Sequence, residues 1–129
     1  MESKRILVVD DESHIIDLLR DILAINGHRI DAAPEASFAL ALVRENIYDA
    51  AIIDFNLPDM DGVMLHRQIR QMDEELAART LFTSGLAQSE KNLGYFHAYG
   101  KGFLSKPFDA QEVLDSLEQL WKEPEEEFP

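Results

Sequence analysis

The chain has 129 residues, 46% of them hydrophobic, which is enough for one domain with a core and too few for two. Its formal net charge of −13 argues against nucleic-acid binding, because phosphate contacts need clustered Lys and Arg. The absence of cysteine excludes disulfide bonds and thiolate metal sites. Residues 1–5 lead into only four apolar residues, too few for a signal peptide or a membrane span, so we expect a soluble cytoplasmic protein.

Short apolar runs alternate with segments of helical periodicity along the chain. The predicted strands are Ile6–Val9, His28–Ala33, Asp49–Asp54, Thr80–Thr83 and Gly102–Ser105. The second strand is interrupted by polar residues, which is typical of a sheet edge. The continuous apolar runs are typical of strands that are buried on both faces of a parallel sheet.

A helix is predicted after each strand. The first ends at Asn26–Gly27, Pro34 occupies the first turn of the second, the fourth spans residues 89–99, and Asp109 opens a capping box on the fifth. The residues predicted to face the sheet are, in chain order, Ile15, Leu18, Leu19, Ile22 and Ile25; Ala36, Ala39, Leu40 and Val43; Val63, Leu65 and Ile69; Leu93 and Phe96; Val113, Leu114, Leu117, Leu120 and Trp121.

Five consecutive strand–helix units predict an α/β fold. We expect a doubly wound, five-stranded parallel sheet with right-handed crossovers and helices on both faces. Residues 124–129 (Pro-Glu-Glu-Glu-Phe-Pro) cannot favourably continue a helix. The domain is therefore predicted to span residues 1–123, followed by an acidic tail or the start of a linker.

Charged residues follow three of the predicted strands. Asp10 and Asp11 come after the first strand, Asp54 ends the third, and Lys106 follows the fifth. Ligands of open α/β sheets bind just beyond the carboxyl ends of the strands. Crowded carboxylates repel one another unless a divalent cation shares them, and a lysine suits a phosphoryl oxygen. The pattern predicts an acidic metal pocket that handles phosphate.

The motifs at these strand ends resemble those of a known family. Val8–Glu12, Asp54 followed by Leu57–Gly62, Ser84–Gly85 and Lys106–Phe108 are similar to the receiver domain of two-component response regulators. The resemblance covers the chain from about Arg5 to Trp121. It implies a flavodoxin-like strand order, 2-1-3-4-5. It also implies a signalling switch in a phosphorelay, with no enzymatic activity beyond phosphoryl transfer to, and hydrolysis from, its own aspartate.

The resemblance also implies roles for individual residues. Asp54 would be the phosphoacceptor, taking its phosphoryl group from a sensor histidine kinase or a histidine phosphotransfer protein. Asp11 and Asp54 would bind Mg²⁺ directly, Asp10 largely through water, and Asn56 through its backbone carbonyl; Mn²⁺ would substitute. Lys106, before an expected cis peptide to Pro107, would contact the phosphoryl group.

Two further residues would transmit the signal. Ser84 would donate its hydroxyl to the phosphoryl group, and Phe103 occupies the family's switch-aromatic position. Rotation of Phe103 would reshape the face made by the fourth helix, the fifth strand and the fifth helix. That face would then select a downstream protein or a second copy of the chain, with no role for nucleic acid or membrane.

Other interpretations remain open. A phosphohydrolase of the haloacid dehalogenase type would need an acid two residues after its nucleophile, where this chain has Asn56. A flavodoxin-like cofactor binder would need a phosphate loop in place of Asp10–Glu12. The chain can also be the N-terminal receiver of a longer regulator. Asp59 and Asp61 are predicted to be turn and cap residues, and the histidines His14, His28, His66 and His97 to be surface residues.

Overall fold

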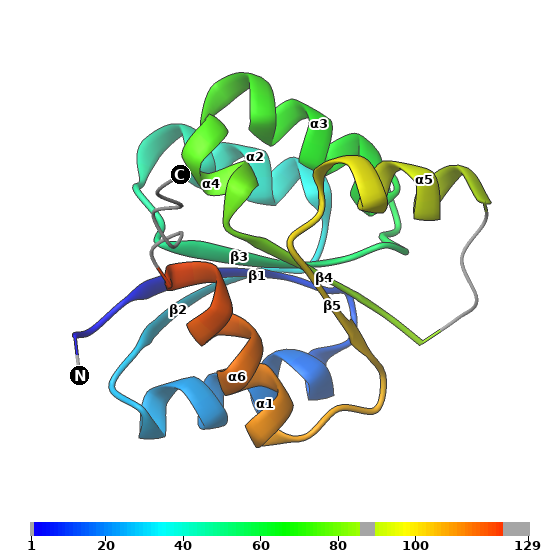
Figure 1. Ribbon diagram of the computed structural model, residues 1–129. Coiled ribbons are helices and arrows are strands. Elements are labelled where there is room, and N and C mark those ends of the chain that lie inside the picture. The colour runs from blue at the N-terminus through cyan, green and yellow to red at the C-terminus, as the bar shows by residue number, and fades with distance from the viewer. Residues whose placement is uncertain (1, 86–89, 123–129) are drawn as a thin grey trace, which may run out of the picture.

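The computed structural model describes residues 2–85 and 90–122 (Figure 1). The strands in this part of the chain are β1 (Arg5–Val9), β2 (Arg29–Ala33), β3 (Ala50–Asp54), β4 (Thr80–Ser84) and β5 (Gly102–Ser105). The helices are α1 (Ser13–Ile25), α2 (Ala36–Glu45), α3 (Gly62–Met72), α4 (Glu74–Ala78), α5 (Glu90–Tyr99) and α6 (Ala110–Trp121). The predicted tail, residues 124–129, lies outside the described residues, as does the start of the predicted fourth helix.

The predicted α/β fold is confirmed. The strands form one parallel sheet in the order β2-β1-β3-β4-β5, so β2 lies at an edge, as its polar residues predicted. Helices α1 and α6 cover one face, and α2, α3, α4 and α5 cover the other (Figure 1). Alternate residues of β1 enter the two cores. Ile6 and Val8 pack against α1 and α6, and Leu7 and Val9 lie in the core on the opposite face. No helix among the described residues is long and apolar enough to cross a bilayer.

The inner faces of two helices differ from the prediction. Leu18 and Ile25 of α1 are 40% and 86% exposed, whereas Leu23 is fully buried. A rotation of 100° per residue centres the buried stripe near Leu19, which leaves Leu18 at its margin and Ile25 outside it. In α5, Leu93 is exposed and Tyr95 enters the core, whereas Phe96 is partly buried against the core, as predicted.

The loop after β3 supplies caps to two helices. Helix α2 begins at Ala36, so Pro34 precedes it and does not occupy its first turn, contrary to the prediction. The carboxylate of Asp59 accepts hydrogen bonds from the backbone N–H groups of Ala36 (2.8 Å) and Ser37 (2.9 Å). Asp61 caps α3 through the N–H of Met64 (2.8 Å), which confirms both aspartates as turn and cap residues.

Two histidines are buried, and their prediction as surface residues is wrong. His66 is only 1% exposed because Tyr95 and Ala77 satisfy its two ring nitrogens. His28 is also buried, where its Nδ1 accepts the N–H of Lys4. A buried polar ring is tolerated when it is hydrogen-bonded.

Replacing Gly62 by Ala is expected to destabilise the protein by about 1–3 kcal/mol. A Cβ at Gly62 would lie 2.9 Å from the Phe55 Cα and closer still to the carbonyl oxygen of Asp54, so the backbone that carries Asp54 would have to shift. Gly94 is the matched control: nothing lies within 4 Å of its added Cβ, and alanine favours its helix by about 0.5–1 kcal/mol. In urea unfolding, the midpoint of Gly62→Ala should therefore fall below that of the wild type and the midpoint of Gly94→Ala should rise above it. Equal midpoints for the two variants would contradict this packing.

Candidate functional site

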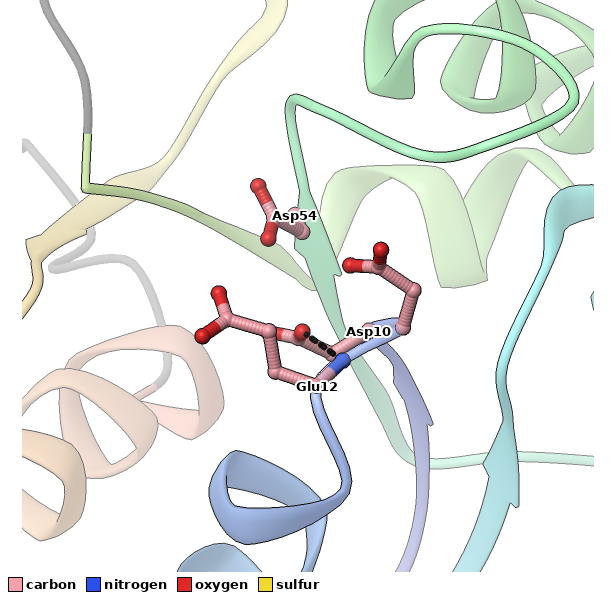
Figure 2. Close-up of side chains that lie close together, drawn as sticks. Asp10, Glu12 and Asp54 are labelled. Atoms are coloured by element: carbon pink, nitrogen blue, oxygen red, sulfur yellow. Dashed lines mark hydrogen bonds between the residues drawn. The ribbon is translucent and has the colours of Figure 1, made fainter.

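Four acidic side chains gather at the carboxyl ends of two adjacent strands. Asp10, Asp11 and Glu12 follow β1, and Asp54 ends β3. Figure 2 shows the side chains of Asp10, Glu12 and Asp54 close together. One carboxylate oxygen from each of the four lies within 4.8 Å of the others. Asp10 and Asp54 are 2% and 3% exposed, so their charges are placed in a low-dielectric region where repulsion is strong.

Two backbone N–H groups fix the buried carboxylates. The N–H of Glu12 donates to Asp10 Oδ1 and that of Asn56 to Asp54 Oδ1, each at 2.9 Å. Each bond spans two residues, the spacing of an Asx-turn, and arises because the chain turns sharply as it leaves the strand. The second oxygen of each aspartate is thereby directed at a common point.

The ammonium group of Lys106 occupies that point. Its Nζ lies 2.8 Å from Asp10 Oδ2, 2.7 Å from Asp54 Oδ2 and 2.9 Å from Glu12 Oε1. The side chain is 10% exposed, and the peptide bond between Lys106 and Pro107 is cis, as the family resemblance implied. The backbone N–H of Lys106 donates to the carbonyl of Ser84 (2.9 Å), which ties the end of β5 to the end of β4.

The pKa values reflect one cation shared among several anions. Burial by itself lowers the pKa of Lys106, but its hydrogen bonds to Asp10, Asp54 and Glu12 outweigh burial and raise that pKa above its ordinary value. Burial raises the pKa of Asp10, and the hydrogen bond from Lys106 offsets this only in part. A second cation would therefore favour the ionised form of Asp10.

The donor set fits a hard divalent cation. Carboxylate oxygens of Asp10, Asp11, Glu12 and Asp54 are the ligands that Mg²⁺ prefers, and two of these residues lie toward solvent, where coordinated water has room. Asn56, predicted to offer its backbone carbonyl, lies in the loop after β3, where it forms an isolated antiparallel β-bridge with Asp61. Among the described residues, this is the group of acidic side chains whose geometry suits a metal ion.

Glu12 has a contact that its place in the sequence did not indicate. Its carboxylate contacts both Lys106 (2.9 Å) and His14 (3.3 Å), and the hydrogen bond from Lys106 lowers its pKa. Adjacency to Asp10 and Asp11 was the available signal, but it did not show which way the side chain points. Glu12 is a further candidate residue of this site.

The predicted switch residues lie on the neighbouring strands. Asp54 is in register with Thr83, so the buried Ser84 is the next residue along β4. Phe103 on β5 is 37% exposed, and its ring centroid lies 5.9 Å from those of both Phe55 and Phe96. Phe103 thus lies at the side of the sheet covered by α5, at the margin of an aromatic cluster.

Comparisons with known proteins agree over most of the chain. Residues 6–118 match the family model of the response regulator receiver domain. The chemotaxis protein CheY of Bacillus subtilis is 32% identical over 114 residues, which is 88% of this chain and 93% of CheY. Response regulator MprA of Mycobacterium sp. (strain KMS) is 34% identical over 116 residues, 90% of this chain but only 50% of MprA.

A solved structure shows the same similarity. The response regulator protein TrrA from Thermotoga maritima, crystallised in complex with Mg²⁺-BeF, is 28% identical with a TM-score of 0.79. The match covers 91% of this chain and 98% of TrrA. The chain is therefore similar to nearly the whole of TrrA and CheY, and it spans half the length of MprA.

Proposed function

The chain belongs to the response regulator receiver domain family, and on this premise we propose that it is a signalling switch activated by phosphorylation of Asp54. One observation carries the proposal: the buried Asp54 carboxylate is fixed between the N–H of Asn56 and the Lys106 ammonium, within a cluster of acidic side chains. This arrangement orients a carboxylate oxygen and keeps a cation ready for the charge of an incoming phosphoryl group.

Phosphoryl transfer to Asp54 is a single displacement at phosphorus, for which the protein supplies the nucleophile and the neutralising charges. A carboxylate oxygen of Asp54 attacks phosphorus, the bond from phosphorus to the donor's histidine nitrogen breaks, and that nitrogen keeps the electron pair. Lys106, 2.7 Å from Asp54, can then pair with a phosphoryl oxygen after a small movement. Asp10, Asp11, Asp54 and the carbonyl of Asn56 would hold Mg²⁺, which when bound neutralises charge on the phosphoryl oxygens.

We propose that Ser84 and Phe103 carry the conformational response to phosphorylation. The Ser84 hydroxyl would bond the phosphoryl group, and Phe103 would leave its half-exposed position for the space beneath α5. The surface of α5, β5 and α6 would then change shape and bind a downstream protein or a second copy. The phosphoryl group would act by its different affinity for two existing conformations of this surface.

The wider setting follows from the family. The donor would be a sensor histidine kinase or a histidine phosphotransfer protein in the cytoplasm, and the domain would span residues 1–123. Because MprA is twice as long as its matched region, a receiver that belongs to a longer regulator is the second candidate. The phosphohydrolase is not favoured, since Asn56 cannot act as the acid that such an enzyme requires.

Phosphorylation is expected to require a divalent cation. The protein incubated with acetyl phosphate and Mg²⁺, or Mn²⁺, should gain one phosphoryl group, measured by intact-protein mass spectrometry. With EDTA in excess the gain should disappear, because crowded carboxylates repel the anionic donor when no cation screens them. Equal labelling with and without EDTA would refute the metal requirement.

A further inference from the structure

A cavity with charged side chains in its wall lies on the α2–α5 side of the sheet, away from Asp54. It has a volume of about 220 Å³ and is bounded by α3, α4 and the end of α5. Ala77 and Ala78 of its wall end α4, one residue before the start of β4, and Lys101 directly precedes β5. The cavity therefore opens near the amino ends of these strands, at the edge opposite the acidic site.

Arg70 of α3 has an unusual environment in this cavity. Its guanidinium lies 3.9 Å from the centroid of the Tyr99 ring, on α5. The Nη1 atom is buried and has no hydrogen-bond partner among the described residues, and Arg70 makes no salt bridge with them. Leaving a buried donor of a charged group without a partner is costly, and an anion that binds after a small movement of the Arg70 side chain would supply the missing acceptor.

A second cation lines the same space. Lys101 is exposed and forms no salt bridge with the described residues, although the protein carries a net charge of −13. Glu74 is the acidic side chain of the lining, but it lies beyond ion-pair distance of both cations. The cavity is thus positive by one charge in an otherwise acidic molecule.

The buried His66 also lines the cavity, but its ring nitrogens are not free to bind a ligand. Its Nε2–H donates to the carbonyl of Ala77 (2.8 Å), so its Nδ1 accepts the hydroxyl of Tyr95 (2.6 Å). Both nitrogens are therefore used, and burial lowers the pKa of the ring and keeps it neutral. Arg70 and Lys101 remain as the charged donors for a ligand.

We propose that this cavity binds an oxyanion, a carboxylate or phosphate group, with Arg70 as the main donor and Lys101 as the second. The planar guanidinium binds such groups through two parallel hydrogen bonds, and its stacking on Tyr99 orients it for this. A volume of about 220 Å³ accommodates one such group. Since Arg70 lies on α3 and Lys101 lies two residues beyond the end of α5, the bound group would also hold these two helices together.

Inorganic phosphate is the first probe, in metal-free buffer whose ionic strength is held constant with KCl. Amide shifts of Tyr99 and Lys101 in ¹H–¹⁵N NMR spectra should saturate with phosphate. Arg70→Gln should weaken binding about tenfold or more, as expected for the loss of a charged hydrogen bond. Lys101→Gln should weaken it by about threefold, since an exposed charge contributes less. Arg44→Gln on α2 removes the same charge away from the cavity and should leave binding unchanged.

A parallel titration with acetate distinguishes the two ligand chemistries. Saturation by phosphate alone would assign the cavity to a phosphoryl group, and saturation by acetate alone would assign it to a carboxylate, such as an acidic side chain of a partner. Shifts that grow linearly with both anions would overturn the proposal, as would equal affinity in the wild type and Arg70→Gln. The titration does not involve Asp54, so its failure would leave the proposed phosphorylation untouched.

Discussion

Asp54→Asn is expected to abolish phosphoryl incorporation from acetyl phosphate and Mg²⁺. The amide has nearly the shape of the carboxylate and can still accept the Asn56 N–H, which is 2.9 Å from Asp54 Oδ1. It cannot form the acyl phosphate, because an amide oxygen carries no full negative charge and is a poor nucleophile. The measurement is the mass of the intact protein, and the variant should stay at its unmodified mass after the wild type is fully labelled.

Asp61→Asn provides the matched control in the same loop. Asp61 caps α3, and asparagine is an equally good N-cap residue, so the fold should persist. This variant should be labelled like the wild type. Labelling of Asp54→Asn at the wild-type rate would place the phosphoacceptor at another residue.

Lys106→Met is expected to destabilise the protein by about 3 kcal/mol at pH 7 without added metal, the cost of removing one partner from a buried ion pair. Lys106 lies within 3 Å of Asp10, Asp54 and Glu12, and the first two of these are buried. Methionine keeps the length of the apolar stem but leaves the carboxylates without their cation. Urea unfolding of both proteins measures the difference.

Added Mg²⁺ should reduce the difference in stability between the wild type and Lys106→Met. A cation held by the same carboxylates takes over their neutralisation, so the unfolding midpoint of Lys106→Met should rise more than that of the wild type. Lys91→Met, which removes an exposed lysine on α5, should unfold like the wild type with and without Mg²⁺. If Lys106→Met were as stable as the wild type, Lys106 would not be the cation that neutralises this cluster.

Several features of the protein are determined by local sequence. The strands appear within a residue or so of their predicted positions, because a parallel strand buried on both faces needs a continuous apolar run, as in Ala50–Ile53. The capping box at Asp109 is confirmed because its contacts span only three residues. The clustering of Asp10, Asp54 and Lys106 was predicted because the carboxyl ends of parallel strands meet at one edge of the sheet, whereas the strand order came from the family resemblance.

Only the tertiary structure decided how polar side chains are paired. Helix α4 has five residues, too few for a periodic pattern, and Asp59 caps α2 from a loop more than twenty residues away. The pairing of Glu12 with Lys106 joins residues 94 apart in sequence. Nothing near His66 in the chain indicates that Tyr95 satisfies its ring. Apolar periodicity is a local property, whereas the burial of a polar group depends on the partner that the fold brings to it.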